Sequence, residues 1–435
     1  MNLLIDKLLK RDYSKFFKKF ALTFSGTSFA QLITILSAPL LTRIYSVEDF
    51  GLFTYFFSII SVFTVIQSLK FQHSVVAEKD SGKSFYLLFL SSAVIIIMTC
   101  LIYFIFSLET PLRNILQNYN SLLLLICLSA GLMAFYDLGY NYLAKLGLFR
   151  YLITVKITQS LFIIISQILF SYEKLSNTAG ILKYEIINIP FVENGLIAGY
   201  FIGQLVSCAL LFIIIFLTTK KDNKKLKKMN FYNWLNIFIE NKKFIFFTMP
   251  AELLNTSTYF LIVYFITNNF GIVYAGIFGL AQRIIISPLN LISTSFLDVF
   301  KNSASQEIGR ENTMINSYRI LFKILVSISI LAFIFILLTK NYYGLLFGPE
   351  WHTTGNLVLI LSPFFCLKFV ASPLSYSFIL LKKQEIDFIW QLGLFFLTIL
   401  IFSTNFDFEE TILLLSITLA LYYAFSIILS YKAVK

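Results

Sequence analysis

Apolar stretches of about 20 residues, separated by short polar or charged segments, recur along the whole chain. A helix of this length crosses the ~30 Å hydrocarbon layer of a bilayer. The pattern therefore predicts an all-α membrane protein with about twelve transmembrane helices. The predicted spans are 20–42, 50–70, 84–107, 121–144, 150–170, 195–218, 244–267, 274–299, 319–339, 356–380, 386–404 and 410–431.

The composition agrees with this prediction. Hydrophobic residues make up 58% of the 435 residues and charged residues only 13%, so a soluble domain of this size lacks the core to bury them. A transmembrane β-barrel is excluded because its strands would be short and would alternate polar with apolar positions. The four cysteines lie within apolar spans and form no CxxC pair, which is typical of packing residues.

The basic residues are distributed unevenly between the two sides of the predicted membrane. Of the 35 lysines and arginines, 28 fall on the side of the N-terminus and 5 on the other side, while Arg283 and Lys368 lie within spans. Cytoplasmic loops carry the excess of Lys and Arg, so both chain ends are predicted in the cytoplasm. The net charge of +12 therefore indicates topology and contact with anionic lipids, and we expect no nucleic-acid partner.

Five regions follow from the spans and the charges. A basic amphipathic stretch over 1–19 is expected to lie on the cytoplasmic face. The densest basic cluster, 220-KKDNKKLKK-228, separates six predicted helices from the next six. The predicted regions are the N-terminal stretch 1–19, a bundle over 20–218, a linker over 219–243, a bundle over 244–431 and a tail over 432–435.

The two predicted bundles repeat a pattern at an offset of 225 residues. The segment 45-YSVEDFGLF-53 corresponds to 270-FGIVYAGIF-278, which pairs Gly51 with Gly276. Two six-helix repeats that both begin inside the cell have the same orientation and imply a pseudo-twofold axis along the membrane normal. We therefore expect substrate to bind between the bundles. In the helices before these segments the same offset pairs polar residues on one helix face: Thr27 with Glu252, Gln31 with Thr256 and Thr34 with Tyr259.

Three segments resemble the polysaccharide flippases of the multidrug/oligosaccharidyl-lipid/polysaccharide exporter superfamily. They are 23-TFSGTSFAQLITILSAPLLTRIYSVEDFGLF-53, 195-GLIAGYFIGQ-204 and 249-MPAELLNTSTYFLIVYFITNNFGIVYAGIFGLAQRIIISPLNLI-292. The resemblance implies a protein of the bacterial cytoplasmic membrane with a MATE-like fold. It implies transport of a lipid-linked oligosaccharide, typically on undecaprenyl pyrophosphate, to the outer leaflet for surface polysaccharide such as O-antigen. A polysaccharide polymerase complex is an expected partner, and no cofactor is expected.

Charged residues inside the predicted spans are the first candidates for function. A charge at the centre of a transmembrane helix costs about 2.5–3.5 kcal/mol on insertion scales, so it persists where it meets water, a partner or a substrate. Arg283 and Lys368 suit a pyrophosphate or acidic sugars, although Arg283 tied to a neighbouring carbonyl or carboxylate, or Lys368 paired with Asp137, are structural alternatives. Asp137 and Glu252 are candidates for coupling to protons or sodium ions, with a salt bridge and an interfacial position as the alternatives.

Polar residues on the repeated faces are candidates for binding sugar hydroxyls. Hydrogen bonds between helices are the structural alternative for all of them. Pro39, Pro288, Pro363 and Pro373 are expected to bend helices. The candidate substrate-binding residues beside the two cations are Thr27, Gln31, Thr34, Asn255, Thr256, Tyr259 and Gln282.

Two other functions fit parts of the sequence. A multidrug exporter of the same superfamily would have the same hydropathy, but its organic-cation ligands favour an acidic site. A membrane oligosaccharide polymerase or ligase would usually carry a large external loop, and the largest one predicted here is only about 171–194. The GKS at 82–84 lacks the first glycine of a phosphate-binding loop, because Ala77 stands there. We therefore expect a transporter and no enzyme activity.

Overall fold

The computed structural model describes residues 26, 28–78, 81–108, 120–179, 194–221, 246, 248–307, 313–381 and 383–435. These residues are almost entirely helical, and none of them lies in a strand. The all-α prediction is therefore confirmed. The amphipathic stretch 1–19, residues 222–243 of the basic linker and Thr27 lie outside the described residues.

A helix coincides with each of the twelve predicted spans. Ten helices among the described residues are long and apolar enough to cross a membrane, and Ser28–Ile44 forms a shorter apolar helix. After Ser28–Ile44, which ends in α2 (Ala38–Ile44), the long helices are α3 (Val47–Ser68), α5 (Ser81–Ser107), α7 (Asn120–Lys145), α8 (Phe149–Ala179), α9 (Gly195–Lys221), α11 (Met249–Phe270), α12 (Ile272–Glu307), α13 (Thr313–Thr339), α15 (His352–Leu380), α16 (Gln384–Phe402) and α17 (Phe408–Val434).

Shorter elements that hydropathy did not predict connect some of these helices. The backbone turns at Leu69 and Lys70, which both have positive φ, and α4 (Gln72–Ala77) follows. Three more elements precede α15: the 3-10 helices Lys340–Tyr342 and Pro349–Trp351, and α14 (Tyr343–Phe347) between them.

The four prolines lie at two kinds of position, at the start of a helix or inside one. Pro39 lies in the first turn of α2, directly after a turn at Ser37 interrupts the first apolar helix. Proline lacks a backbone N–H, so it is tolerated at the start of a helix. Pro288 lies inside α12, and Pro363 and Pro373 lie inside α15.

The chain divides into two compact units. The first unit comprises Met1–Thr34 and Ile60–Pro250, and the second comprises Ile35–Ile59 and Ala251–Lys435. The border therefore crosses α3, whose first half packs with the C-terminal half of the chain. The predicted six-plus-six domains differ from this division mainly in the placement of 35–59.

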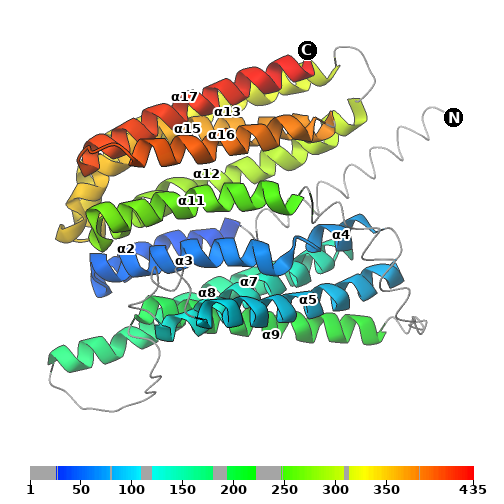
Figure 1. Ribbon diagram of the computed structural model, residues 1–435, viewed down its shortest axis with the longest axis horizontal. Helices are drawn as coiled ribbons and strands as arrows, with labels where there is room; N and C mark the ends of the chain where they lie inside the picture. Colours follow the sequence, from blue (N-terminus) through cyan, green and yellow to red (C-terminus); the bar gives the residue numbers. More distant parts are fainter. Residues whose placement is uncertain are drawn as a thin grey trace. The chain divides into compact units, whose positions relative to one another are not determined.

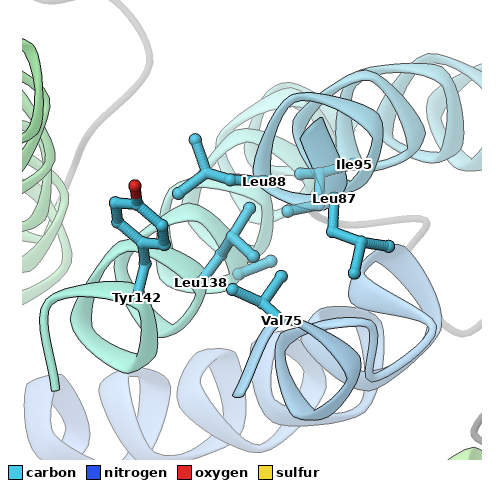
Figure 2. Close-up of a cluster of buried hydrophobic side chains, with 7 residues drawn as sticks. Val75, Leu87, Leu88, Ile95, Leu138 and Tyr142 are labelled. Atoms are coloured by element: carbon cyan, nitrogen blue, oxygen red, sulfur yellow. The ribbon is translucent and has the colours of Figure 1, made fainter. Parts of the chain in front are cut away.

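In the first unit, α7 contacts α4, α5, α8 and α9 (Figure 1). Side chains from α4, α5 and α7 enclose an apolar core, shown in Figure 2. Between helices in a membrane, such side chains stabilise the bundle through close van der Waals packing. The buried members of this core are Val75, Leu87, Leu88, Ile95, Ala134, Leu138 and Tyr142.

Helices α8 and α9 approach each other closely at two glycines of the 195-GLIAGYFIGQ-204 segment. A Cβ atom on Gly199 would lie 2.5 Å from the backbone nitrogen of Gln167, and one on Gly203 would lie 2.6 Å from that of Ile163. Small residues four positions apart allow membrane helices to pack backbone to backbone. This contact explains the glycine spacing of the segment.

In the second unit, α15 is the central helix. It contacts α12, α13, α16 and α17, and α17 also packs against α13 and α16 (Figure 1). Tyr318 of α13 donates a hydrogen bond to the carbonyl of Ile427 in α17 at 3.0 Å. The hydroxyl of Tyr422 in α17 donates to the carbonyl of Trp390 in α16 at 2.9 Å.

Gly203→Ala is predicted to destabilise the first unit, because the added methyl group meets backbone atoms that cannot rotate away. Overpacking of this kind costs about 1–3 kcal/mol. Thermal unfolding of the purified protein in detergent measures the effect as a lower Tm. Gly139→Ala is the matched control, since its Cβ would meet only the side chains of Ile215 and Leu211, at 3.4 Å. Equal Tm values for the two variants would contradict the prediction.

Candidate functional site

Polar residues follow one face of α11 in the second unit. Glu252 lies in the first turn, Asn255 is exposed, and Thr256 and Tyr259 are half-buried. The hydroxyl of Thr256 donates to the carbonyl of Glu252 at 3.0 Å, within its own helix. The Thr256 hydroxyl therefore makes no hydrogen bond from α11 to another described helix.

The repeat pairs this face of α11 with a face of the first apolar helix, Ser28–Ile44. On that helix, in the first unit, the side-chain amide of Gln31 lacks a hydrogen-bond partner for its oxygen. The Oε1 atom of Gln31 is buried and has no hydrogen-bond partner among the described residues. A buried acceptor left unpaired costs about 1–3 kcal/mol, so Gln31 is suited to a donor that arrives with a ligand or water. The Thr34 hydroxyl donates to the carbonyl of Ala30 at 3.2 Å.

Lys368 lies in the middle of α15 and is half-buried. Its Nζ atom lies 5.6 Å from the ring centre of Phe364 and 6.0 Å from that of Tyr423 in α17. Among the described residues of the second unit it forms these two ring contacts and no ion pair. Asp137 belongs to the first unit, so the alternative of a Lys368–Asp137 pair gains no support within either unit.

The magnitudes indicate that the two rings do not compensate the charge of Lys368. Both rings lie near the outer limit of about 6 Å for cation–π contacts, where each contact contributes about 0.5–1 kcal/mol, so the two together contribute about 1–2 kcal/mol. A lysine at the centre of a membrane helix costs about 2.5–3.5 kcal/mol. The difference favours water or an anion at the ammonium group.

Arg283 and Gln282 lie in α12, and both side chains are half-buried. Arg283 follows Gly276 by seven residues, which is two helical turns, and therefore lies on the same face of α12. The rise per residue places it about 10 Å further along the helix. α12 packs directly against α15, the helix that carries Lys368.

Asp137 and Lys156 form an oppositely charged pair inside the first unit. Asp137 lies in α7 and Lys156 in α8, close enough for their charges to attract. The Nζ atom of Lys156 lies 5.4 Å above the ring of Tyr140. One turn deeper, Gln159 donates to the side-chain oxygen of Gln204 at 2.7 Å. The hydrogen bond between Gln159 and Gln204 therefore joins α8 to α9 one turn from Lys156.

Lys156 and the rings around Lys368 were not among the predicted site residues. Lys156 is among the 28 basic residues that the charge distribution assigns to the cytoplasmic side, although Asp137 precedes the end of α7 by eight residues and Lys156 follows the start of α8 by seven. Nearly equal distances from a tight turn bring two residues of a helical hairpin to a similar depth, and this signal indicates that the two are close. No sequence signal marks Tyr423, because its contact with Lys368 depends on the packing of α15 and α17.

The predicted residues divide between the two units. Gln31, Thr34 and Asp137 belong to the first unit, and the other described candidates belong to the second. Among the described residues there is no group of three or more His, Cys, Asp or Glu side chains arranged to hold a metal ion. The candidates of the second unit are Glu252, Asn255, Thr256, Tyr259, Gln282, Arg283 and Lys368.

No protein-family model and no curated protein matches the chain. Solved structures do match it over nearly its whole length. The MATE multidrug transporter DinF-BH in complex with rhodamine 6G has a TM-score of 0.65 at 14% identity, covering 95% of both chains. The lipid II flippase MurJ in an inward closed conformation has a TM-score of 0.65 at 16% identity, covering 94% of this chain and 87% of MurJ. The chain has the MATE and MurJ fold.

An inward-facing MATE transporter of the MOP superfamily is also similar, with a TM-score of 0.61 at 14% identity and 95% and 92% coverage. The predicted MATE-like architecture is therefore confirmed, and with ten apolar helices among its described residues the chain is a multi-pass membrane protein. The MATE and MurJ fold is common to proteins with drug and lipid-linked cargo. The fold alone does not select between them, so the cargo has to be argued from the side chains.

A double-mutant cycle is predicted to show coupling between Asp137 and Lys156. Each of Asp137→Asn and Lys156→Met leaves the other charge without its partner, whereas the double variant removes both charges. We expect the sum of the two single losses of stability to exceed the loss of the double variant by about 1 kcal/mol. Thermal unfolding in detergent measures all four proteins, and additive losses would show that the two charges do not interact.

Proposed function

We propose that the chain flips a lipid-linked oligosaccharide, carried on undecaprenyl pyrophosphate, from the cytoplasmic to the outer leaflet by alternating access. The observation that carries this proposal is the ammonium of Lys368, which is held in a membrane helix by two aromatic rings and by no carboxylate among the described residues of its unit. Such a cation attracts a pyrophosphate or an acidic sugar and repels an organic cation.

Arg283 adds a second cation in the neighbouring helix. Its guanidinium offers a planar set of donors that fits two phosphate oxygens, whereas Lys368 supplies a mobile point charge. α12 and α15 pack together, so both cations belong to one helix pair of the second unit. A pyrophosphate headgroup has two phosphate groups, so one can bind to Arg283 and the other to Lys368.

Sugar hydroxyls require neutral donors and acceptors near this charge. The polar face of α11, with Asn255, Thr256 and Tyr259, supplies them within the same unit. In the first unit, the amide oxygen of Gln31 has no hydrogen-bond partner among the described residues and can accept a hydrogen bond from a hydroxyl group. The long lipid tail remains in the bilayer, so the protein has to shield only the polar headgroup.

Two carboxylates are candidates for ion coupling. Asp137 lies in the first unit and Glu252 in the second. Proton or sodium uptake at either carboxylate would supply the energy for return to the inward-facing state. Multidrug export is the second candidate function, because the same fold occurs in a multidrug transporter whose structure contains rhodamine 6G.

Proteoliposomes that contain the purified protein test the cargo. We expect flipping of an undecaprenyl-pyrophosphate-linked oligosaccharide, and a loss of about ten- to a hundredfold in Lys368→Gln, because a charge-assisted hydrogen bond contributes about 1.5–3 kcal/mol. Arg283→Gln is expected to lower the rate by a similar factor. Accessibility of the glycan to an added glycosidase measures the flipped fraction.

Lys432→Gln is the matched control, because Lys432 lies in the last turn of α17, at the end of the chain and away from both cations. All variants are compared at equal amounts of folded protein, as judged by size-exclusion chromatography. Wild-type flipping in both Lys368→Gln and Arg283→Gln would refute the site. Transport of rhodamine 6G with no flipping of the oligosaccharide would favour the multidrug function.

A further inference from the structure

Helices α13 and α17 of the second unit are joined at the ends that the charge distribution places in the cytoplasm (Figure 1). The buried hydroxyl of Tyr318 in α13 donates to the carbonyl of Ile427 in α17 at 3.0 Å. It also lies 2.6 Å from the hydroxyl of Ser430, which is buried as well. Hydrogen bonds between helices hold membrane bundles together, so this contact fixes the two helix ends relative to each other.

The next residue of each helix forms a second pair, at the surface. Arg319 donates from Nη2 to the hydroxyl of Tyr431 at 2.9 Å, and its guanidinium carbon lies 5.9 Å from the centre of the tyrosine ring. The arginine itself is exposed. A guanidinium has five N–H donors, and this hydrogen bond uses one of them. Tyr431 therefore holds the cation in place while donors remain for a second ligand.

Two lysines lie close to this pair. Lys323 follows Arg319 by four residues on the same face of α13 and is exposed. Lys435 follows Tyr431 by four residues, is exposed, and is close enough for its charge to act on the tyrosine hydroxyl. Among the described residues, Arg319, Lys323 and Lys435 form no ion pair with a carboxylate. An anion at this position would relieve the repulsion between the three positive charges.

The depth of the cluster follows from the hydropathy of the two helices. One predicted span begins at Arg319 and another ends at Tyr431, so both residues mark the cytoplasmic boundary of the apolar layer. Tyrosine is enriched at this boundary in membrane proteins. Lys323 lies one turn deeper, and its long side chain can extend back to the same level. The cations therefore lie at the level of the lipid headgroups of the cytoplasmic leaflet.

An exposed apolar surface begins directly beside the cations. Ile320 and Ile324 each follow one of the α13 cations, and their side chains are 61% and 38% exposed. Ile428 of α17 is 52% exposed. A soluble anion or an acidic peptide would neutralise the cations and leave this surface uncovered. A phospholipid supplies both a phosphate for the cations and acyl chains for the isoleucines.

We propose that the cytoplasmic ends of α13 and α17 bind one anionic phospholipid, whose phosphate lies between Arg319 and Lys323 and whose acyl chains cover Ile320 and Ile324. Basic surfaces between membrane helices on the cytoplasmic side suit such headgroups. A zwitterionic lipid binds less well, because its own ammonium group meets the three cations. Tyr431 is a positioning residue that orients Arg319. The proposal rests on the predicted topology and does not depend on the cargo.

Native mass spectrometry of the delipidated protein tests this site with equimolar phosphatidylglycerol and phosphatidylcholine that have identical acyl chains. We expect the first bound lipid to be phosphatidylglycerol by a factor on the order of twenty, since each of two basic residues contributes about fivefold. A variant with both Arg319→Gln and Lys323→Gln is expected to lose this preference. Tyr431→Phe removes only the orienting hydroxyl and is expected to lower the preference about two- to threefold.

Lys432→Gln is the matched control, because it removes one exposed cation at the same end of α17. Lys432 lies about 100° around the helix from Tyr431, so its loss is expected to leave the preference unchanged. All variants are first shown to be folded by size-exclusion chromatography. A loss of preference in the double variant with none in Lys432→Gln supports the site.

Three results would overturn the proposal. An unchanged preference in the double variant would show that its two cations do not bind the headgroup. An equal fall in Lys432→Gln would show attraction to the overall positive charge and no defined site. Undecaprenyl pyrophosphate is offered to the same proteins as a third lipid, and a double variant that loses this lipid but retains phosphatidylglycerol would assign the surface to the cargo.

Discussion

The cost of a charge inside a membrane helix is the constraint on which the rest of the account depends. Water solvates an ammonium group, hydrocarbon does not, and aromatic rings at nearly 6 Å return only part of the loss. In the first unit, by contrast, the charge of Asp137 attracts that of Lys156. Among the described residues, one unit therefore contains a lysine near a carboxylate, and the other contains Lys368 without a carboxylate partner in its unit. This asymmetry makes Lys368 the stronger candidate for a binding group.

The internal repeat gives this asymmetric site a symmetric frame. Gly51 and Gly276 meet through reciprocal contacts, as two related helices do at a twofold axis. Arg283, however, has the small residue Ser58 as its counterpart at the same offset. Duplicated backbone architecture thus coexists with side chains that have diverged, and the arginine at this position belongs to one half alone. A single binding region with one polarity suits a substrate that has one charged headgroup.

Hydropathy and charge were enough to predict the helices, because length and apolar character are local properties that the bilayer imposes on every span. The repeat also pointed to Gly51 and Gly276 before their contact was known. The hydrogen bond from Trp351 to Thr42 escaped prediction, since about 300 residues separate the two in sequence and only packing joins them. The ring contacts of Lys368 could not be predicted for the same reason. The proximity of Asp137 and Lys156 could have been predicted from their distances to the ends of α7 and α8.

Binding of the headgroup in the absence of transport tests the central claim most directly. Native mass spectrometry of the purified protein with equimolar undecaprenyl pyrophosphate and undecaprenol compares two lipids that share a tail and differ in charge. The account predicts preferential retention of the pyrophosphate by the wild-type protein and loss of that preference when Lys368 is replaced by glutamine. Equal retention of both lipids by the wild-type protein, or an unchanged preference in the variant, would contradict the role assigned to the buried cation.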